Sequence, residues 1–586
     1  MQRVRGYALA SVFASVLAFG AEASAQELEL GAPPEGVEPS SEAAWDIPGY
    51  VIIDGDDGLG TSGLDALREE LAQSFGGLGF TPTDLVERTS ATIARVAPSD
   101  VARLVARLRG DGRVERVEPL AWARANFVPN DPLYGEQWHM DRVGARAAWD
   151  YATGRGATVA VVDTGIACED HGPFTKGTDL NRTKCVGGWN FVTNTEHAND
   201  DQGHGSHVAG TIAQSTDNGV GATGLAFHAE LMPVKVLNGN GWGSTADVAD
   251  GIRWAADHGA HVINLSLGSP RNSSVLQAAV DHARSRGVVV VAAAGNSGGS
   301  VGFPGGSEGV IGVSATDQSD KLAKFSSRGK GVDIGAPGVA VVQQTICQGG
   351  KNKCEIFPGY NGTSMASPHV AGVAAMLVSQ GVSDPAAIER ILGDTARKVD
   401  DSAEGRARFG AGILDAASAT RTVALQQGLV RLALVAVLTA FVAFFASKKR
   451  GARNPLSLGF VVAALFTGPG LLFFAPLFAS RTMLPIDLLA RPFADLDLYV
   501  GASLHRLLPL ANALVPFALL AVGWQSLRLR SIIAGVGVGT AAYLGSIVLL
   551  GQAWSPVGAT LGAAWCLGNA AVSLLIARFA LAETKA

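Results

Sequence analysis

Three short stretches of this 586-residue chain carry side chains that could do chemistry together. Asp163 ends an apolar run in VVDTG, His204 lies in DDQGHGSHVAGT, and Ser364 lies in GYNGTSMASPHVAG. Proteins use carboxylates, imidazoles and hydroxyls for proton transfer and nucleophilic attack. Because each of the three lies in its own glycine-rich neighbourhood, their joint occurrence indicates a reaction centre where they meet.

Ser364 stands where a glycine-rich turn changes into a helix of small residues. A helix start offers unpaired backbone N–H groups and the positive end of the helix dipole, which stabilise negative charge. A serine at such a position is also a common N-cap, which carries no chemistry. From this stretch alone, both interpretations stay open.

The other two motifs have alternatives of their own. Asp-Thr-Gly also occurs in aspartic proteases, where a second lobe supplies a second aspartate, and Asp333 in Asp-Ile-Gly is the nearest candidate here. His204 and His207 share one helical face, as a pair of metal ligands would. The sequence offers no third ligand at a recognised spacing, so a structural role is the commoner explanation of such a pair.

The elements around these motifs predict how they are brought together. Continuous apolar runs rich in Val and Ala alternate with helical patterns such as 246–258, which favours an α/β domain with a parallel sheet covered on both faces. Active sites in such sheets lie at the carboxyl ends of the strands, where Asp163 falls. The candidate core strands are residues 157–163, 230–237, 261–267, 288–295 and 309–315.

Residues 133–420 resemble the subtilase family of subtilisin-type serine peptidases. The resemblance rests on VAVVDTGI, GHGSHVAGTIA, NLSLG, VVAAAGN, APG and NGTSMASPHVAG, which follow the family's order. It implies that Asp163, His204 and Ser364 form a catalytic triad. It also implies that Asn296 is the side-chain donor of the oxyanion hole.

The same resemblance predicts where substrate lies. Glycines in two short segments would let an extended substrate approach closely and pair through its main chain, although tight packing alone is an alternative reason for them. The predicted walls of the cleft are Ser266, Leu267, Gly268, Ala293, Ala294 and Gly295.

The region before the peptidase domain falls into three parts. Residues 1–25 have two arginines, a short apolar run and an Ala-Ser-Ala site, the pattern of a cleaved signal peptide rather than an uncleaved anchor. Residues 26–47 are acidic and poor in apolar residues, which predicts a disordered lead-in. Residues 48–125 show the pattern of a ferredoxin-like α+β unit and resemble the subtilases' inhibitory prodomain, with cleavage expected near residues 121–127. The peptidase domain then spans residues 126–420.

An exported protein meets an oxidising environment, in which cysteines form disulfides. Cys168 with Cys185, and Cys347 with Cys354, are close in sequence, so two local disulfides are expected, with four free thiols as the alternative. Cys566 stands alone in an apolar segment.

No cofactor is required for the expected chemistry. The resemblance suggests structural calcium, for which Asp217 and Asn218 are candidate ligands. The loop that carries them, residues 215–224, differs in length from the family's pattern, so the set of metal ligands stays open.

Residues 421–586 are far more apolar than the rest of the chain, and this pattern predicts an all-α membrane region. Five runs are long and apolar enough to span a bilayer, with four as the alternative count. Lys and Arg clusters follow the first, third and fifth runs, which favours a cytoplasmic location for those sides and an external peptidase domain. The predicted spans are residues 429–446, 456–479, 507–524, 532–554 and 557–577.

These patterns predict a multi-pass protein of the cell membrane, in contact with the lipid bilayer, whose catalytic domain lies on the periplasmic or extracellular side. Its expected partners are protein or peptide substrates and its own prodomain. A net charge of -6, with no Lys/Arg-rich block in the soluble part, argues against nucleic acid. The alternative is a non-catalytic membrane receptor or scaffold that binds peptides through a peptidase-like domain; the intact set of four site residues favours the enzyme.

Overall fold

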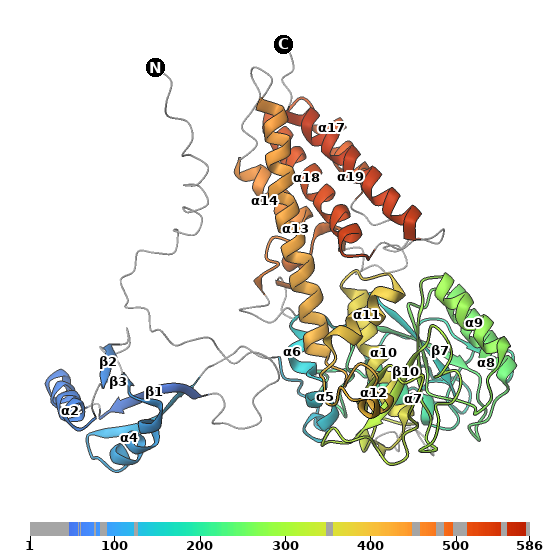
Figure 1. Cartoon of the computed structure of the whole chain (residues 1–586), viewed down its shortest axis with the longest axis horizontal. Coiled ribbons are helices and arrows are strands. Elements are labelled where there is room, and N and C mark those ends of the chain that lie inside the picture. The colour runs from blue at the N-terminus through green and yellow to red at the C-terminus, as the bar shows by residue number, and fades with distance from the viewer. Residues whose placement is uncertain are drawn as a thin grey trace. The chain divides into compact units, whose positions relative to one another are not determined.

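The computed structural model describes residues 46–121, with gaps at 57, 59, 76–77 and 83–90, and residues 127–581, with gaps at 347–355, 448–456, 476–485, 496–511 and 553–558. Contacts divide the chain into two compact units, residues 1–124 and 125–586, each with a hydrophobic core of its own (Figure 1). The predicted signal peptide, nearly all of the lead-in, most of the cleavage region and the Cys347–Cys354 pair lie outside the described residues.

The N-terminal unit is a four-stranded antiparallel sheet with two helices. The strand order β2-β3-β1-β4 and the element order βαββαβ define the ferredoxin-like fold that was predicted. Leu64, Leu67 and Leu71 are buried along one face of α2, as their spacing indicates. The elements are β1 (Asp46–Gly55), α2 (Gly60–Ser74), β2 (Gly79–Pro82), β3 (Ala91–Arg95), α4 (Val101–Leu108) and β4 (Val114–Ala121).

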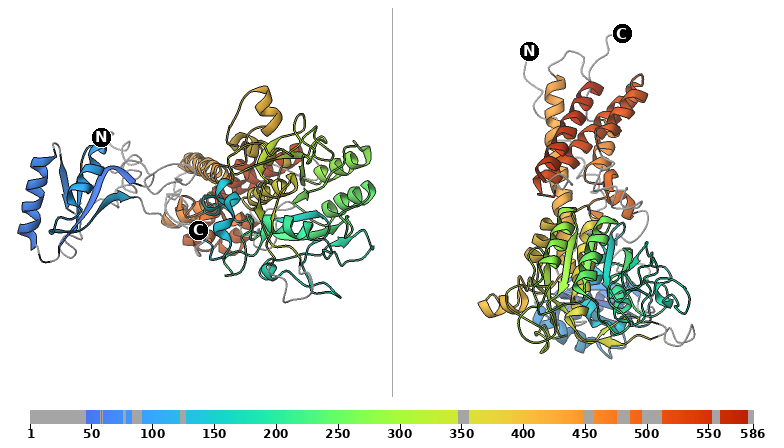
Figure 2. Two further views of the ribbon diagram at one scale, coloured as in Figure 1. Left: turned by 90° about the horizontal axis from the view of Figure 1, so that it is seen from below. Right: turned by 90° about the vertical axis from the view of Figure 1, so that its right-hand side faces the viewer.

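A seven-stranded parallel sheet forms the centre of the second unit (Figure 2). Its order is β11-β10-β9-β8-β5-β7-β6. All five predicted core strands are present, and two short edge strands join them. The strands are β5 (Thr158–Asp163), β6 (Trp189–Asn190), β7 (Glu230–Lys235), β8 (Val262–Leu265), β9 (Val289–Ala293), β10 (Ile311–Thr316) and β11 (Ile334–Pro337), and a separate antiparallel pair is β12 (Val341–Val342) with β13 (Gly359–Tyr360).

Both faces of the parallel sheet are buried, which explains why apolar residues fill both faces of its strands and do not alternate with polar ones. In β5, Val159 and Val161 belong to one core cluster, with α7 and α10, while Ala160 and Val162 belong to a second, with α8 and α9. The helices of this α/β domain are α5 (Trp138–Arg142), α6 (Ala145–Trp149), α7 (His204–Ala213), α8 (Thr245–Asp257), α9 (Ser274–Ser285), α10 (Thr363–Ser379), α11 (Pro385–Thr395) and α12 (Ala403–Phe409).

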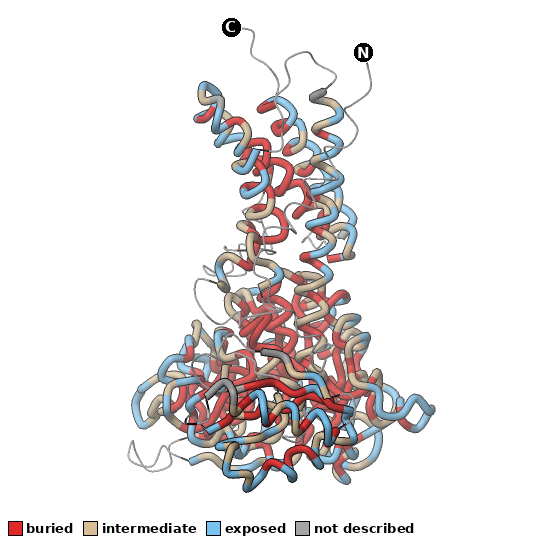
Figure 3. The backbone as a smooth tube through the Cα atoms, turned by 90° about the vertical axis from the view of Figure 1, so that its left-hand side faces the viewer, coloured by how far each residue is buried: buried red, intermediate tan, exposed pale blue. Residues whose placement is uncertain are grey.

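The C-terminal part is helical and apolar. Among the described residues, three helices are long and apolar enough to cross a membrane, at Ala416–Phe445, Arg528–Leu549 and Thr560–Leu581, and they coincide with the first, fourth and fifth predicted spans. Buried and exposed stretches alternate along these helices, whereas the core of the α/β domain is buried throughout (Figure 3). The helices are α13 (Ala416–Ser447), α14 (Leu458–Thr467), α15 (Ile486–Ala490), α17 (Leu514–Gly523), α18 (Leu527–Leu549) and α19 (Ala559–Leu581).

The second and third predicted spans differ from the structure. Their described residues form the short helices α14 and α17, ten residues each, which correspond to about 15 Å of helix against a hydrocarbon core of ~30 Å. α14 ends at Thr467 because Gly468, Pro469 and Gly470 follow it. Hydropathy alone counted this apolar run as one span, although the glycines and the proline interrupt its helix.

Candidate active site

Asp163 and His204 meet at the carboxyl edge of the parallel sheet. Asp163 is the last residue of β5 and fully buried, and His204 is the first residue of α7. The Nδ1 of His204 lies 2.8 Å from Oδ1 of Asp163, which also accepts the backbone N–H of Thr164 at 2.7 Å. Gly205 permits this approach, because a Cβ there would lie 2.1 Å from the carbonyl oxygen of Gly165.

The protonation of His204 reflects two opposing effects. Burial disfavours the charged imidazolium, but the charge of Asp163 and its hydrogen bond outweigh burial and raise the pKa of His204 above its ordinary value. The negative charge of Asp200 acts in the same direction. The imidazole is therefore tuned to accept a proton more readily than a free histidine.

Asp200 and Lys235 support this pair, and sequence reasoning missed both. The carboxylate of Asp200 accepts backbone N–H groups of Gly203 and Ser206 at 2.9 Å each, so it fixes the start of α7. The buried ammonium of Lys235 donates to the carbonyl oxygen of Thr164 at 2.6 Å, next to Asp163, and to Asp201 at 2.7 Å. In the sequence both residues look like ordinary surface charges.

Ser364 lies in the first turn of α10, where a proline shapes its surroundings. Pro368 has no N–H to offer the carbonyl of Ser364, four residues before it, and the hydroxyl of Ser266 donates to that carbonyl at 2.7 Å instead. The hydroxyl of Ser364 in turn donates to the carbonyl of Ser266 at 3.0 Å. Buried Asn264 donates to the Ser266 hydroxyl and thereby orients it. In the structure, the nucleophile candidate is thus held by Ser266, directly after β8, and not by His204.

Asn296 lies beside the start of α10. Its Oδ1 accepts both the backbone N–H and the hydroxyl of Thr363 at 2.9 Å. This arrangement fixes the amide plane and assigns the Nδ2 group to the opposite side, as a donor. Asn296 and the N–H groups at the helix start thus lie next to one another.

A cavity of about 630 Å³ opens beside these groups. His204, Ser266, Leu267 and Gly268 line it, so one of the two predicted walls lies along it. Ala293 and Ala294 are buried instead, and the main chain of Ala294 and Gly295 is engaged with other backbone groups. The lining residues that sequence reasoning missed include Leu237, Trp242, Leu276, Phe303 and Pro304.

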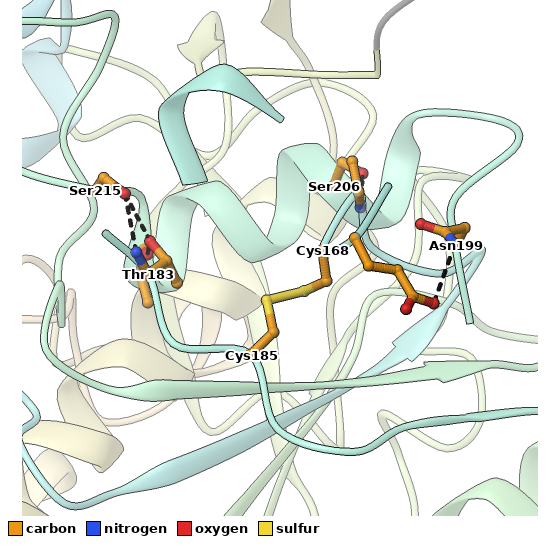
Figure 4. Close-up of a disulfide and its surroundings, with 9 residues drawn as sticks. Cys168, Thr183, Cys185, Asn199, Ser206 and Ser215 are labelled. Carbon is orange, nitrogen blue, oxygen red and sulfur yellow. Dashed lines mark hydrogen bonds between the residues drawn. A yellow bond between two sulfur atoms is a disulfide. The ribbon is translucent and has the colours of Figure 1, made fainter. Parts of the chain in front are cut away.

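The predicted disulfide between Cys168 and Cys185 is present, with Cα atoms 6.0 Å apart (Figure 4). It closes the segment that follows β5, next to α7. There, the hydroxyl of Ser206 donates to the carboxylate of Asp200 at 2.7 Å. The hydroxyl of Ser206 accepts the N–H of Ala167 at 3.0 Å. Closing a loop of this length stabilises a fold by about 3 kcal/mol on the chain-entropy account. Cys566 is buried and free.

The loop predicted to hold calcium gathers buried carboxylates. Asp179 is fully buried; it accepts Nδ2 of Asn218 and the N–H of Ala222, and burial raises its pKa to about 7. Asp131 accepts the N–H groups of Asp217 and Asn218, and burial raises its pKa as well. Within the described ranges, no group of three or more His, Cys, Asp or Glu side chains is arranged to hold a metal ion. A cation here would therefore also need amide and backbone oxygens.

The fold and the site together define a class of protein. A parallel α/β domain presents an aspartate, a histidine and a serine at one edge of its sheet, next to a substrate-sized cavity, as serine hydrolases do. A model of the subtilase family matches residues 154–412.

Curated relatives agree with that match. Thermitase of Thermoactinomyces vulgaris is 42% identical over 275 residues, 47% of this chain and 93% of the relative. Subtilisin Savinase of Lederbergia lenta is 44% identical over 287 residues, 48% of this chain and 98% of the relative. A solved protease of Pseudoalteromonas arctica is 34% identical with a TM-score of 0.44, covering 51% of this chain and 100% of that one. The chain belongs to the subtilase family, and it is a subtilisin-type serine endopeptidase.

Proposed function

We propose that Ser364, His204 and Asp163 hydrolyse peptide bonds through an acyl-enzyme. The observation that carries this is the 2.8 Å contact between His204 and the buried Asp163, on a cavity that also reaches Ser266. When substrate binds, the hydroxyl of Ser364 exchanges the Ser266 carbonyl for Nε2 of His204, which takes its proton during attack and passes it to the leaving amine. Asp163 keeps the imidazole in the required tautomer and stabilises the imidazolium.

Negative charge on the substrate carbonyl is stabilised by two donors. Nδ2 of Asn296 and the backbone N–H of Ser364 lie at the positive end of α10, where they supply an oxyanion hole. In subtilisin, loss of such an asparagine lowers kcat by about 100- to 1000-fold. Extended protein segments are the substrates that suit an open cavity with a main-chain wall at Ser266, Leu267 and Gly268.

The N-terminal unit acts as an inhibitory prodomain that the enzyme itself removes. Its ferredoxin-like fold and its own core support this role, because it folds as a separate body ahead of a sheet built from non-local contacts. Cleavage falls near residues 121–127 and converts the proenzyme into the active peptidase.

A fluorophosphonate probe tests the nucleophile. Wild-type protein should be labelled at Ser364 once its N-terminal unit is removed, whereas Ser364→Ala should lose the label and keep its N-terminal unit attached, as N-terminal sequencing would show. Ser285→Ala, on α9, is the matched serine control and should label as the wild type does. Wild-type protein that stays unlabelled after confirmed removal of the N-terminal unit would overturn the proposal.

The peptidase domain is tethered to the outer face of the cell membrane. Three helices long enough to cross a bilayer support this, and their directions support the orientation. α18 starts near Arg528 and Arg530, and the residue Gln552 after its other end accepts the Ser383 hydroxyl of the peptidase domain at 3.4 Å. The basic end is therefore the one away from the peptidase, as the positive-inside rule requires of an external catalytic domain.

A structural calcium ion is held by the loop around Asp179 and Asn218, together with Asp131. Asp179 is buried, and its pKa is raised to about 7 because burial disfavours the charged carboxylate. The ionised form therefore destabilises the fold unless a cation binds to it. We expect EGTA to lower the Tm of Ser364→Ala protein by about 3–5 °C relative to calcium levels near 100 times Kd. Asp179→Asn should have a lower Tm that no longer responds to EGTA. Equal Tm values with and without calcium in Ser364→Ala protein would contradict the site.

A further inference from the structure

The peptidase domain and the C-terminal helices share one continuous helix. α13 begins inside the peptidase core, where Ala416, Ala419 and Val423 are buried, and continues without a break to Ser447. Its 32 residues correspond to about 48 Å of helix. A flexible tether is therefore absent where the domain meets its first apolar helix, within the described stretch 416–447.

Residues 491–495, which we call the clasp, hold the far end of the nucleophile helix. Arg491 is only 3% exposed, and its Nη1 donates to the carbonyl oxygen of Ser379 at 2.8 Å. Ser379 is the last residue of α10, the helix that begins with Thr363 and Ser364. A buried cation at this position satisfies a free carbonyl and meets the negative end of the helix dipole.

The other end of the clasp holds α13 and α18. Asp495 lies 3.6 Å from Arg431 of α13 and accepts the hydroxyl of Tyr543 of α18 at 2.6 Å. Arg431 also donates to the hydroxyl of Ser546 at 3.1 Å, and its guanidinium lies over the Tyr543 ring. All of these side chains are buried. Removing one partner would leave a buried charge uncompensated, so the cluster favours a single arrangement of the three segments.

Buried amides tie the same parts together. Gln380, directly after α10, donates Nε2 to the carbonyl of Thr420 in α13 at 2.9 Å. Gln427 of α13 donates to the side chain of Gln552 at 3.1 Å. Both contacts join groups with little access to water, where unmade hydrogen bonds are costly.

We propose that α13, the clasp and the buried amides, together called the junction, hold the peptidase domain in a fixed position relative to the membrane helices. The enzyme then selects membrane-anchored substrates by the distance of the cleavage site from the bilayer. The inference rests on the proposed membrane tethering and on the proposed triad. A domain on a flexible tether meets cleavage sites at any height within its reach. A domain on a continuous helix, clasped at α10, cleaves only segments with a spacer long enough to reach its fixed cavity.

The test uses the full-length chain in vesicles of phosphatidylethanolamine and phosphatidylglycerol. Single-span reporter proteins carry one cleavable sequence, set back from the bilayer by spacers that grow in steps of three residues, about 10 Å each when extended. A soluble peptide of the same sequence measures the chemistry alone. The double variant Arg491→Ala/Asp495→Asn opens the clasp. The matched control is Arg253→Ala, which removes a surface ion pair with Asp250 on α8.

The wild type and Arg253→Ala should cleave reporters only above one threshold spacer. The clasp variant should cleave shorter spacers, by at least one step, while its turnover of soluble peptide stays within about twofold. A wild type without a threshold, or a clasp variant with the same threshold, would overturn the rigid mount and leave the peptidase function standing. A wild type that cuts neither substrate would instead overturn the proposed function.

Hydrogen exchange on the wild type tests whether α13 is a rigid connection, even if the clasp variant fails to fold. Amides between Ala416 and Leu434 should be protected without interruption, whereas a flexible joint there would exchange at the rate of unstructured chain and would overturn the proposal. Where the clasp variant folds, exchange at Ser379 to Val382 should rise by about tenfold or more, since a charged hydrogen bond is lost.

Discussion

At the scale of single residues, the site depends on how Asp163 balances the burial of His204. Burial alone would push the pKa of His204 below that of a free imidazole, and the neighbouring carboxylate reverses that effect. The neutral imidazole is the form that can accept a proton from Ser364. Under the proposed mechanism, we therefore expect the raised pKa of His204 to set the lower pH limit of activity.

Asp163→Asn tests this balance. Without the carboxylate, burial dominates and the pKa of His204 falls, so the acid limb of kcat/KM should move to lower pH. The rate itself should drop by about 10⁴-fold, because the imidazole loses its orientation and the stabilisation of its charged form. The pH dependence of fluorophosphonate labelling measures both effects. An acid limb that stays in place would show that another group sets it.

At the scale of elements, buried histidines make α10 and its neighbours sensitive to acid. His139 of α5 and His369 of α10 are fully buried, with Nδ1 and Nε2 only 2.9 Å apart, and His207 of α7 stacks on Tyr360 at 4.2 Å. Burial lowers the pKa of His207 and His369 to about 4 and that of His139 well below its ordinary value. All three are therefore neutral in the folded protein.

The unfolded chain takes up protons on these histidines below pH 6.5, and the folded chain does so only near pH 4. The depressed pKa values therefore have no effect on stability above pH 6.5 and lower it as the pH falls towards 4, by up to about 1.4 kcal/mol per pH unit for each histidine. Urea unfolding of Ser364→Ala protein between pH 7 and 4.5 should show this slope. His369→Gln should reduce the slope by about one histidine, and the exposed His258→Gln should not. Equal slopes in all three proteins would refute this account.

Elements with long, uniform patterns were predictable from sequence, and short ones were not. The five core strands are continuous apolar runs because both faces of the sheet are covered. β6 has only two residues, and β11 contains Gly335 and Pro337, so neither shows a strand pattern although both pair in the sheet. The pairings of the sheet set their conformation, and no local pattern records those pairings.

The site shows the same division. Asp163, His204 and Ser364 each sit in a local motif, so the sequence placed them at element ends. Lys235 has no such motif, because its burial depends on β5 and β7 lying side by side. Arg431, Arg491 and Asp495 likewise look like scattered charges in an apolar sequence, because only the fold brings them together. Groups that act through distant contacts are therefore the ones that sequence reasoning missed.

At the scale of the whole molecule, the boundary of the peptidase domain lies inside a helix. The predicted end at residue 420 cuts α13, whose first turns fill the core beside α6 and α10. Ala416 donates its N–H to the carbonyl of Val143 at 2.8 Å, and Val423 is 1% exposed. The first part of α13 thus belongs to the peptidase by packing, although its sequence continues directly into an apolar helix.

A chain that ends after Asp415 should therefore be much less stable than one that ends after Gln427, both carrying Ser364→Ala to prevent self-cleavage. The shorter chain exposes the core surface that Val423 covers, worth about 1.5–3 kcal/mol by itself, and leaves the buried amide of Gln380 without the Thr420 carbonyl. Together these losses predict a free energy of unfolding lower by about 3 kcal/mol or more, measured by urea denaturation. The same denaturation midpoint for both chains would mean that α13 only passes over the domain. A large difference would mean that proteolytic release of a stable peptidase must cut after Val423, because a cut before it removes part of the core.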